Sequence, residues 1–153
     1  MTSESAITDE IRALIGKESP PVVYEVDKTT LRAFARACGY TDPLFYDEPF
    51  AKSKGYRSLP APPGFLGHAV FDPHADSGMQ RVPTSLTRVL NGGTECEYLD
   101  TVCAGDTLIA TTRLADVYER RGSLGLMLFT TRETVYRRDG KAVAIFRGTI
   151  INY

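Results

Sequence analysis

Apolar residues recur at helical spacing in two short stretches of the first third of the chain. The second stretch is the clearer, because its apolar positions fall at i, i+3, i+4 and i+7: Leu31, Phe34, Ala35 and Cys38. Asp27 is placed to cap this helix and Gly39 to end it. Thr8 and Gly16 bracket the first helix in the same way. The pattern predicts two amphipathic helices, with Cys38 as a small buried thiol on the second.

Strand-like runs make up much of the remaining chain. PPVVYEV, at 20–26, favours a first strand because β-branched and aromatic residues follow a proline break. Four longer runs, rich in Thr, Val, Ile and aromatic residues, occupy 85–99, 107–121, 123–138 and 141–153. Arg121–Gly122 and Asp139–Gly140 are typical tight-turn dipeptides between them. An antiparallel sheet wrapped around a long helix buries both apolar faces, so the sequence predicts an α+β domain.

The two dipeptide turns also predict a strand register. In that register Phe129 lies opposite both Leu114 and Ile150. One face of the sheet is then the apolar core, made of Leu108, Ala110, Leu114, Met127, Phe129 and Ile150.

The same register gathers arginines on one face. Arg132 lies opposite Arg147, with Arg113 on the neighbouring diagonal. Like charges directly across a ladder are destabilising. Two interpretations stay open: a solvated face whose side chains fan apart, or a site that holds an anion. A one-residue bulge would remove the cluster altogether.

Composition and charge exclude several classes of function. The 153 residues suit one domain, 1–153, with 1–20 as an N-terminal extension that contains the first helix. Eighteen basic residues against 19 acidic ones give a net charge of −1, so nucleic acid is a poor partner. No apolar run approaches the roughly 20 residues that span a bilayer, so no membrane association is expected.

Cysteine usage and the first residues of the chain indicate the compartment. The three cysteines form no CxxC pair, which suits reduced thiols. MTSESAITDEIRALIG is polar and acidic, unlike a signal peptide. Both features favour a cytoplasmic protein.

Residues 39–83 form no long periodic segment, and stretches this long are usually functional. This segment contains four residues of metal-ligand type: His68, Asp72, His74 and Asp76. The six-residue separation of the histidines, with a proline between, matches no familiar ligand spacing. We therefore expect surface histidines and no metal.

A second feature of the segment is APPGFLG, at 61–67. Pro62 and Pro63 can begin a short helix, because their missing N–H groups cost nothing there. Gly64 would then offer its N–H at the positive end of the helix to a carbonyl oxygen that gains charge. The alternative is an ordinary core helix that binds nothing.

Three stretches together resemble a known family. They are 39–67 (GYTDPLFYDEPFAKSKGYRSLPAPPGFLG), 90–108 (LNGGTECEYLDTVCAGDTL) and 113–144 (RLADVYERRGSLGLMLFTTRETVYRRDGKAVA). From about residue 22 to residue 153 the chain is similar to a single hot-dog domain of the MaoC-like hydratase/dehydratase superfamily, in its N-terminal-type, fatty-acid-synthase-like branch. The resemblance implies a hot-dog fold.

Catalytic members of that superfamily read approximately G-D-x-N-P-[LI]-H-x-D in the first stretch, followed by H-G. The positions that keep the frame are Gly39, Asp42, Pro43, Leu44 and Asp47. Tyr40 stands where the catalytic aspartate is expected and Phe45 where the catalytic histidine is expected. Pro63 replaces the second histidine, and Gly64 matches the oxyanion glycine. The resemblance therefore implies an active-site loop without either group of its proton-transfer dyad.

The resemblance also implies a substrate and a partner. The reaction adds water to, or removes it from, an acyl-CoA or acyl-carrier-protein thioester, without cofactor or metal. No catalytic residue is expected in this chain. The expected substrate-binding residues are Tyr40, Phe45, Tyr46, Pro63, Gly64 and Phe65.

In this interpretation a partner hot-dog chain supplies the Asp/His dyad, and a homodimer is the other possible assembly. Two further interpretations stay open. One is a self-sufficient hydratase or thioesterase of altered mechanism, with Asp42 or Asp47 as base. The other is a non-enzymatic acyl-CoA-binding protein.

Overall fold

The computed structural model describes residues 5–74 and 81–153. The helical elements are α1 (Asp9–Leu14), α2 (Lys28–Ala37), the 3₁₀ turn η1 (Pro43–Phe45) and α3 (Glu48–Ser53). The strands are β1 (Val22–Glu25), β2 (His68–Ala69), β3 (Val89–Tyr98), β4 (Thr107–Gly122), β5 (Gly125–Arg138) and β6 (Lys141–Asn152).

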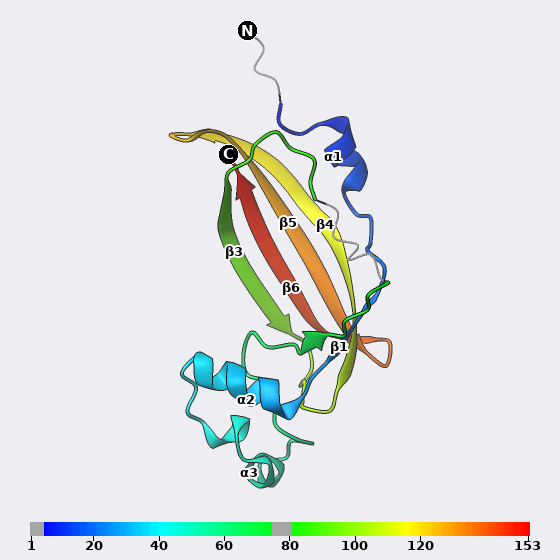
Figure 1. Cartoon of the computed structure of the whole chain (residues 1–153), viewed down its shortest axis with the longest axis vertical. Coiled ribbons are helices and arrows are strands. Elements are labelled where there is room, and N and C mark those ends of the chain that lie inside the picture. The colour runs from blue at the N-terminus through cyan, green and yellow to red at the C-terminus, as the bar shows by residue number, and fades with distance from the viewer. Residues whose placement is uncertain (1–4, 75–80) are drawn as a thin grey trace.

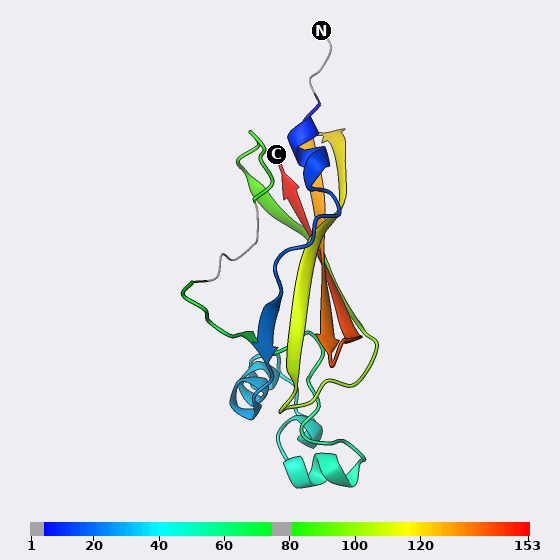
Figure 2. The same cartoon turned by 90° about the vertical axis from the view of Figure 1, so that its right-hand side faces the viewer.

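The six strands form one antiparallel sheet in the order β2-β1-β4-β5-β6-β3. The sheet is long and curled, with α1 near one end and α2 and α3 at the other (Figures 1 and 2). β3 forms one edge, and most of its residues are exposed. The predicted α+β class is confirmed.

The two predicted helices form where their caps place them. Thr8 accepts a hydrogen bond from the Ile11 N–H, and Asp27 accepts one from the Thr30 N–H. One expectation on α2 is wrong, because Cys38 is exposed. The helix ends at Ala37 and the chain turns away at Gly39, so Cys38 leaves the apolar face.

With ten residues, α2 is the longest helix in the described ranges, and it lies against the end of the sheet rather than along it (Figure 2). Leu31 of α2 is fully buried in a cluster with the fully buried Leu108 of β4 and Ala144 of β6. We call the sheet face that carries Leu108 the inner face. None of the helices in residues 5–74 and 81–153 combines the length and apolar content needed to cross a membrane.

The strand register differs from the prediction. Asp139–Gly140 does turn between β5 and β6, with Arg138 opposite Lys141. The β4–β5 turn, however, lies at 123–124, because Gly122 pairs with Gly125. Bulges also shift the register, one after Leu114 in β4 and one at Val143 in β6, opposite Tyr136 and Arg137 of β5.

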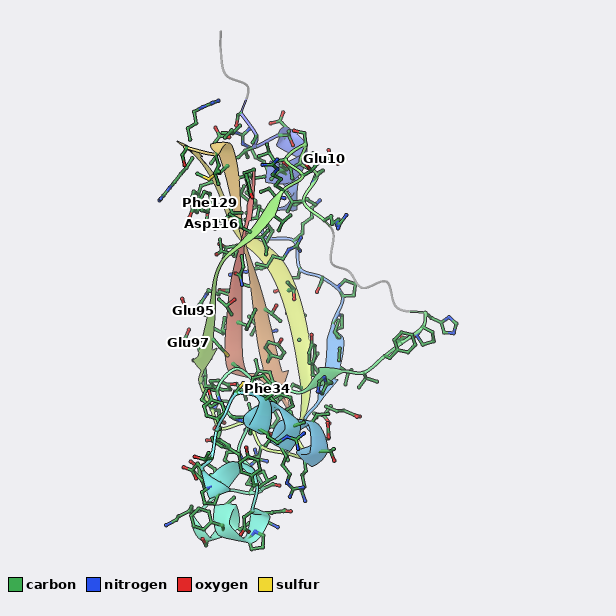
Figure 3. The ribbon with its side chains drawn as sticks, turned by 60° about the vertical axis from the view of Figure 1, so that its left-hand side comes forward. Glu10, Phe34, Glu95, Glu97, Asp116 and Phe129 are labelled. Carbon is green, nitrogen blue, oxygen red and sulfur yellow. The ribbon has the colours of Figure 1, made fainter. Side chains whose placement is uncertain are left out.

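The predicted core face is therefore correct on β4 and wrong on β5. Leu108, Ala110 and Leu114 are buried. Phe129 pairs with Tyr118 and Ile151 instead of Leu114 and Ile150. It lies on the face opposite to Leu108, as does Met127, while Ile150 is exposed. The ring of Phe129 stacks on Tyr118 there, with centroids 4.7 Å apart (Figure 3 labels Phe129).

The register shift also removes the arginine cluster. Arg147 and Arg113 both lie opposite Glu133, and Arg132 falls on the other face of β5. The Glu133 carboxylate accepts from Arg113 Nη2 at 2.7 Å and from Arg147 Nε at 2.8 Å. Hydrogen bonds from Arg113 first, and then from Arg147, hold the pKa of Glu133 below its ordinary value. Arg113 and Arg147 are thus paired with a carboxylate of the same sheet face, so the anion-site interpretation is wrong.

This ion-pair network predicts an acid-dependent contribution to stability. A carboxylate with a depressed folded-state pKa stabilises the fold above its unfolded pKa, and that contribution is lost as pH falls through the folded value. We expect Glu133→Gln to lower the free energy of unfolding by about 1 kcal/mol at pH 7, with the difference shrinking below about pH 4. Urea unfolding between pH 7 and pH 3 measures this.

Glu25→Gln, at an exposed position of β1, is the control and should track the wild-type chain. A Glu133→Gln deficit that stays constant down to pH 3 would contradict the prediction.

Candidate functional site

The segment that follows α2 is held in shape by its own carboxylates. Asp42 accepts from the Leu44 N–H at 2.9 Å and so begins η1. Asp47 accepts from the Phe50 N–H at 3.0 Å and begins α3. In each carboxylate, Oδ1 caps a helix, which is a structural task.

Tyr40 and Phe45 are brought together by this loop. Their ring centroids lie 5.5 Å apart, and both rings are half-buried. The Tyr46 hydroxyl donates to the Tyr40 carbonyl oxygen at 2.5 Å, which ties the two ends of the loop. The two positions aligned with the dyad therefore meet in space as a pair of aromatic rings.

The stretch APPGFLG forms a turn and not the predicted helix start. The Phe65 N–H donates to the Pro62 carbonyl at 3.0 Å, and Gly64 has φ +91°. A positive φ of this size strongly favours glycine and is incompatible with proline. Pro62 is buried under the turn, whereas Pro63 is exposed. Gly64 is therefore the tip of a tight turn.

Gly67 explains why the chain does not continue as a helix. A Cβ at this position would lie 2.4 Å from the Glu25 carbonyl oxygen. The backbone passes this close because β2 pairs with β1, where Glu25 lies opposite His68. Strand pairing therefore replaces the expected helix.

Phe65 of the turn belongs to the core. It is 5% exposed, and its ring packs on Phe34 of α2 with centroids 5.4 Å apart. Phe45 packs against the same buried cluster, so one apolar body joins the turn and the loop. Figure 3 shows Phe34 where α2 meets the end of the sheet.

The Gly64 amide already has an acceptor. Its N–H donates to the Tyr98 hydroxyl at 3.1 Å. Tyr98 ends β3, 34 residues away in sequence. Nothing local in the sequence indicates a contact between the turn and β3, so the sequence prediction missed Tyr98.

The segment that begins at Gly39 is anchored near Arg57 by a buried carboxylate. The sequence prediction missed this contact as well. The Asp106 side chain, 4% exposed, binds Arg57 at 2.8 Å and Arg138 at 2.8 Å, and accepts from the Cys103 N–H. Burial acts to raise the pKa of Asp106, but hydrogen bonds from Arg57, from the Cys103 N–H and from Arg138 outweigh it and lower that pKa. Asp106 thus joins the end of the loop to β5.

The histidines remain on the surface. His68 is exposed, with its ring edge-on to Phe65, and His74 lies in an exposed turn capped by Asp72. Across the part of the chain that the structure describes, no three His, Cys, Asp or Glu residues gather as metal ligands would. Asp76 lies outside the described residues.

Comparison with known families identifies the class of the chain. Residues 13–146 match the model of the FAS1-like, dehydratase domain region. The chain belongs to this family. A UPF0336 protein of Saccharopolyspora erythraea is 30% identical over 143 residues, which cover 92% of this chain and 89% of the relative.

Solved structures agree with the family on the fold. The ChsH1-ChsH2 complex from Mycobacterium tuberculosis matches with a TM-score of 0.75 and 18% identity, over 96% of this chain and 90% of that chain. The HadBC (3R-hydroxyacyl-ACP dehydratase) complex of the same organism gives a TM-score of 0.68 and 20% identity, over 91% and 97%. A MaoC-like dehydratase gives 0.68 and 21%, over 93% of this chain but 43% of its own. The MaoC-like hot-dog fold is confirmed, and the family is one of hydro-lyases.

Proposed function

We propose that this chain is the acyl-binding subunit of an (R)-specific enoyl-CoA hydratase or 3-hydroxyacyl-thioester dehydratase, and that a partner hot-dog chain supplies the Asp/His dyad. The observation that carries this proposal is the contact of Tyr40 and Phe45. At the two positions where the family needs an acid and a base, this chain places two packed rings 5.5 Å apart. Hydration of a double bond requires proton transfer, so those groups must come from another chain.

The residues around the ring pair suit an acyl chain. Tyr40, Phe45 and Tyr46 are half-buried, and the exposed Pro63 and Gly64 lie beside the buried Phe65. Phe65 lies in the buried apolar cluster and Phe45 packs against it, so together they offer a surface where an apolar chain can be shielded from water. We assign these six residues to substrate binding. Neither the residues nor the reaction calls for a cofactor.

Two findings on relatives support a second hot-dog chain. The ChsH1-ChsH2 and HadBC structures are each complexes of two named proteins. The MaoC-like dehydratase chain is more than twice as long as the part that this chain matches. We propose that 1–153 is one such unit, with 1–20 as an extension, and that it works in the cytoplasm on an acyl-CoA or acyl-carrier-protein thioester.

The edge of the sheet offers a place for the partner. β3 has ten residues and pairs with β6 on one side. An unpaired strand edge of this length invites association with another chain. Glu95 and Glu97 lie along this edge, and their carboxylates pair with Arg147 (Figure 3).

A self-sufficient hydratase is the weaker alternative, because Asp42 and Asp47 are engaged as caps. A non-enzymatic acyl-CoA-binding protein agrees equally well with the ring pair in the lone chain. The presence of a catalytic partner separates this alternative from the proposal.

The test is co-expression with a hot-dog chain from the same organism that carries the intact D-x-N-P-x-H motif. We expect the two to co-elute in size-exclusion chromatography and the pair to hydrate crotonyl-CoA. A matched partner variant with the motif's histidine changed to alanine should still co-elute and lose about 10²–10⁴-fold in turnover. A chain that elutes alone, and adds nothing to the partner's rate, would overturn the proposal.

A further inference from the structure

The Tyr98 hydroxyl is bound on both sides by the turn at 62–65. It accepts from the Gly64 N–H at 3.1 Å, and the Phe65 carbonyl oxygen lies 3.0 Å away as its acceptor. The Pro62 carbonyl, at 3.4 Å, is a more distant second acceptor. A phenol has one O–H to donate and lone pairs to accept with, so within this turn it both donates its proton and accepts from the Gly64 N–H.

Independent contacts fix both partners of this hydrogen bond. Tyr98 lies across the ladder from Ala144, which is fully buried. The chain just beyond is tied again, since the Leu99 N–H donates to the Val143 carbonyl at 2.9 Å. On the other side, the buried Phe65 holds the turn against α2. The fold therefore holds Tyr98 and the turn in position for this hydrogen bond.

The hydroxyl also keeps its proton. Although Tyr98 is 36% exposed as a whole, loss of water around its hydroxyl, which faces the turn, raises the pKa of Tyr98 above its ordinary value. The phenol therefore remains neutral at physiological pH and can donate to Phe65 while it accepts from Gly64. For the Gly64 N–H, the neutral phenol oxygen is the same kind of acceptor as a carbonyl oxygen.

We infer that the Tyr98 hydroxyl occupies the Gly64 amide by accepting its hydrogen bond. The Gly64 N–H is then not available as a donor to the carbonyl oxygen of a bound thioester. An amide that stabilises an oxyanion must lie about 2.7–3.1 Å from that oxygen. The phenol oxygen fills this position, and a second oxygen cannot enter without displacing the ring. The amide that polarises the thioester then belongs to the partner chain. The identity of the ligand rests on the proposed function, whereas the occupied amide does not.

The first test needs no ligand. Tyr98→Phe keeps the ring and removes the acceptor, so the Gly64 amide proton should shift upfield in the nitrogen-proton NMR spectrum. Its hydrogen exchange should accelerate roughly five- to tenfold. Tyr118→Phe, on the outer face of the sheet, is the matched control and should leave the Gly64 signal unchanged. A Gly64 amide that Tyr98→Phe leaves as it is in the wild-type chain would overturn the inference.

The second test uses butyryl-CoA, a saturated thioester that cannot be hydrated. In the wild-type chain, binding should move the ring signals of Phe45 and shift the Gly64 amide proton only as a neighbouring signal. In Tyr98→Ala, the Gly64 amide proton should shift clearly further downfield on binding, because it is then able to donate to the thioester carbonyl. A downfield shift in the wild-type chain as large as that in Tyr98→Ala would overturn the inference. If butyryl-CoA moves no signal of the wild-type chain, the proposed acyl-binding role is wrong, and hydrogen exchange in Tyr98→Phe still decides whether Tyr98 occupies the amide.

Discussion

Purified alone, this chain should hydrate crotonyl-CoA at least about 10⁴-fold more slowly than a hot-dog hydratase that carries both dyad groups. Each positioned acid or base typically contributes about 10²–10⁴-fold, and neither group is present at the aligned positions. Phe45 has no ionisable group, and its ring is packed against Tyr40 with no carboxylate between them. Loss of the enoyl absorbance, followed with the lone chain at micromolar concentration, measures the rate.

Two variants identify the source of any residual rate. Tyr40→Phe removes the last hydroxyl from the two dyad positions and should leave the residual rate unchanged. Asp42→Asn keeps an amide oxygen that can still cap η1, so a fall in rate there would reveal the carboxylate as a base. Turnover by the lone chain at an ordinary hydratase rate would contradict the two-chain interpretation and favour a self-sufficient enzyme.

The sequence predicted those elements that are encoded locally. Caps such as Thr8 and Asp27 act on amides three residues away, so their effect is readable from spacing. Asp139 and Gly140 form the predicted hairpin turn, where both adopt positive φ. Arg121–Gly122 has equal turn character, but the strands continue past it because Gly122 pairs with Gly125.

Register could not be predicted, because it depends on bulges that no local pattern marks. Between β5 and β6 the extra residue is Val143, which fills the core at 1% exposure. Packing, and not turn chemistry, therefore decides the alignment there. One such shift was enough to put Glu133, instead of Arg132, opposite Arg147.

The candidate site likewise combines features that are encoded locally with features that depend on distant residues. The five-residue separation of Tyr40 and Phe45 lies within one loop, and the structure brings the two rings together. The helix expected after Pro62 fails because of a distant partner, since Glu25 of β1 pairs with the chain just beyond Gly67. Tyr98 and Asp106 act across 34 and 49 residues, on Gly64 and Arg57 respectively. A single sequence has no signal for contacts of that range.

The largest stability effect is expected at Asp106. Asp106→Asn keeps the size of the side chain but removes the charge that pairs with Arg57 and Arg138. Breaking a buried ion pair on one side typically costs 3–5 kcal/mol, because the remaining charge stays buried and unpaired. Arg57 is 57% exposed and can turn to water, whereas Arg138, at 21%, has less access. We therefore expect a loss near the lower limit, about 3 kcal/mol, in urea unfolding at pH 7.

Asp100→Asn is the matched control, because Asp100 pairs with the same Arg138 but is 39% exposed. That change should cost no more than about 1 kcal/mol. Arg57 lies at the end of the loop that carries the ring pair, so Asp106→Asn should also weaken butyryl-CoA binding, while Asp100→Asn should not. Equal losses of stability from the two variants would show that Asp106 is an ordinary surface partner and that other contacts hold the loop in place.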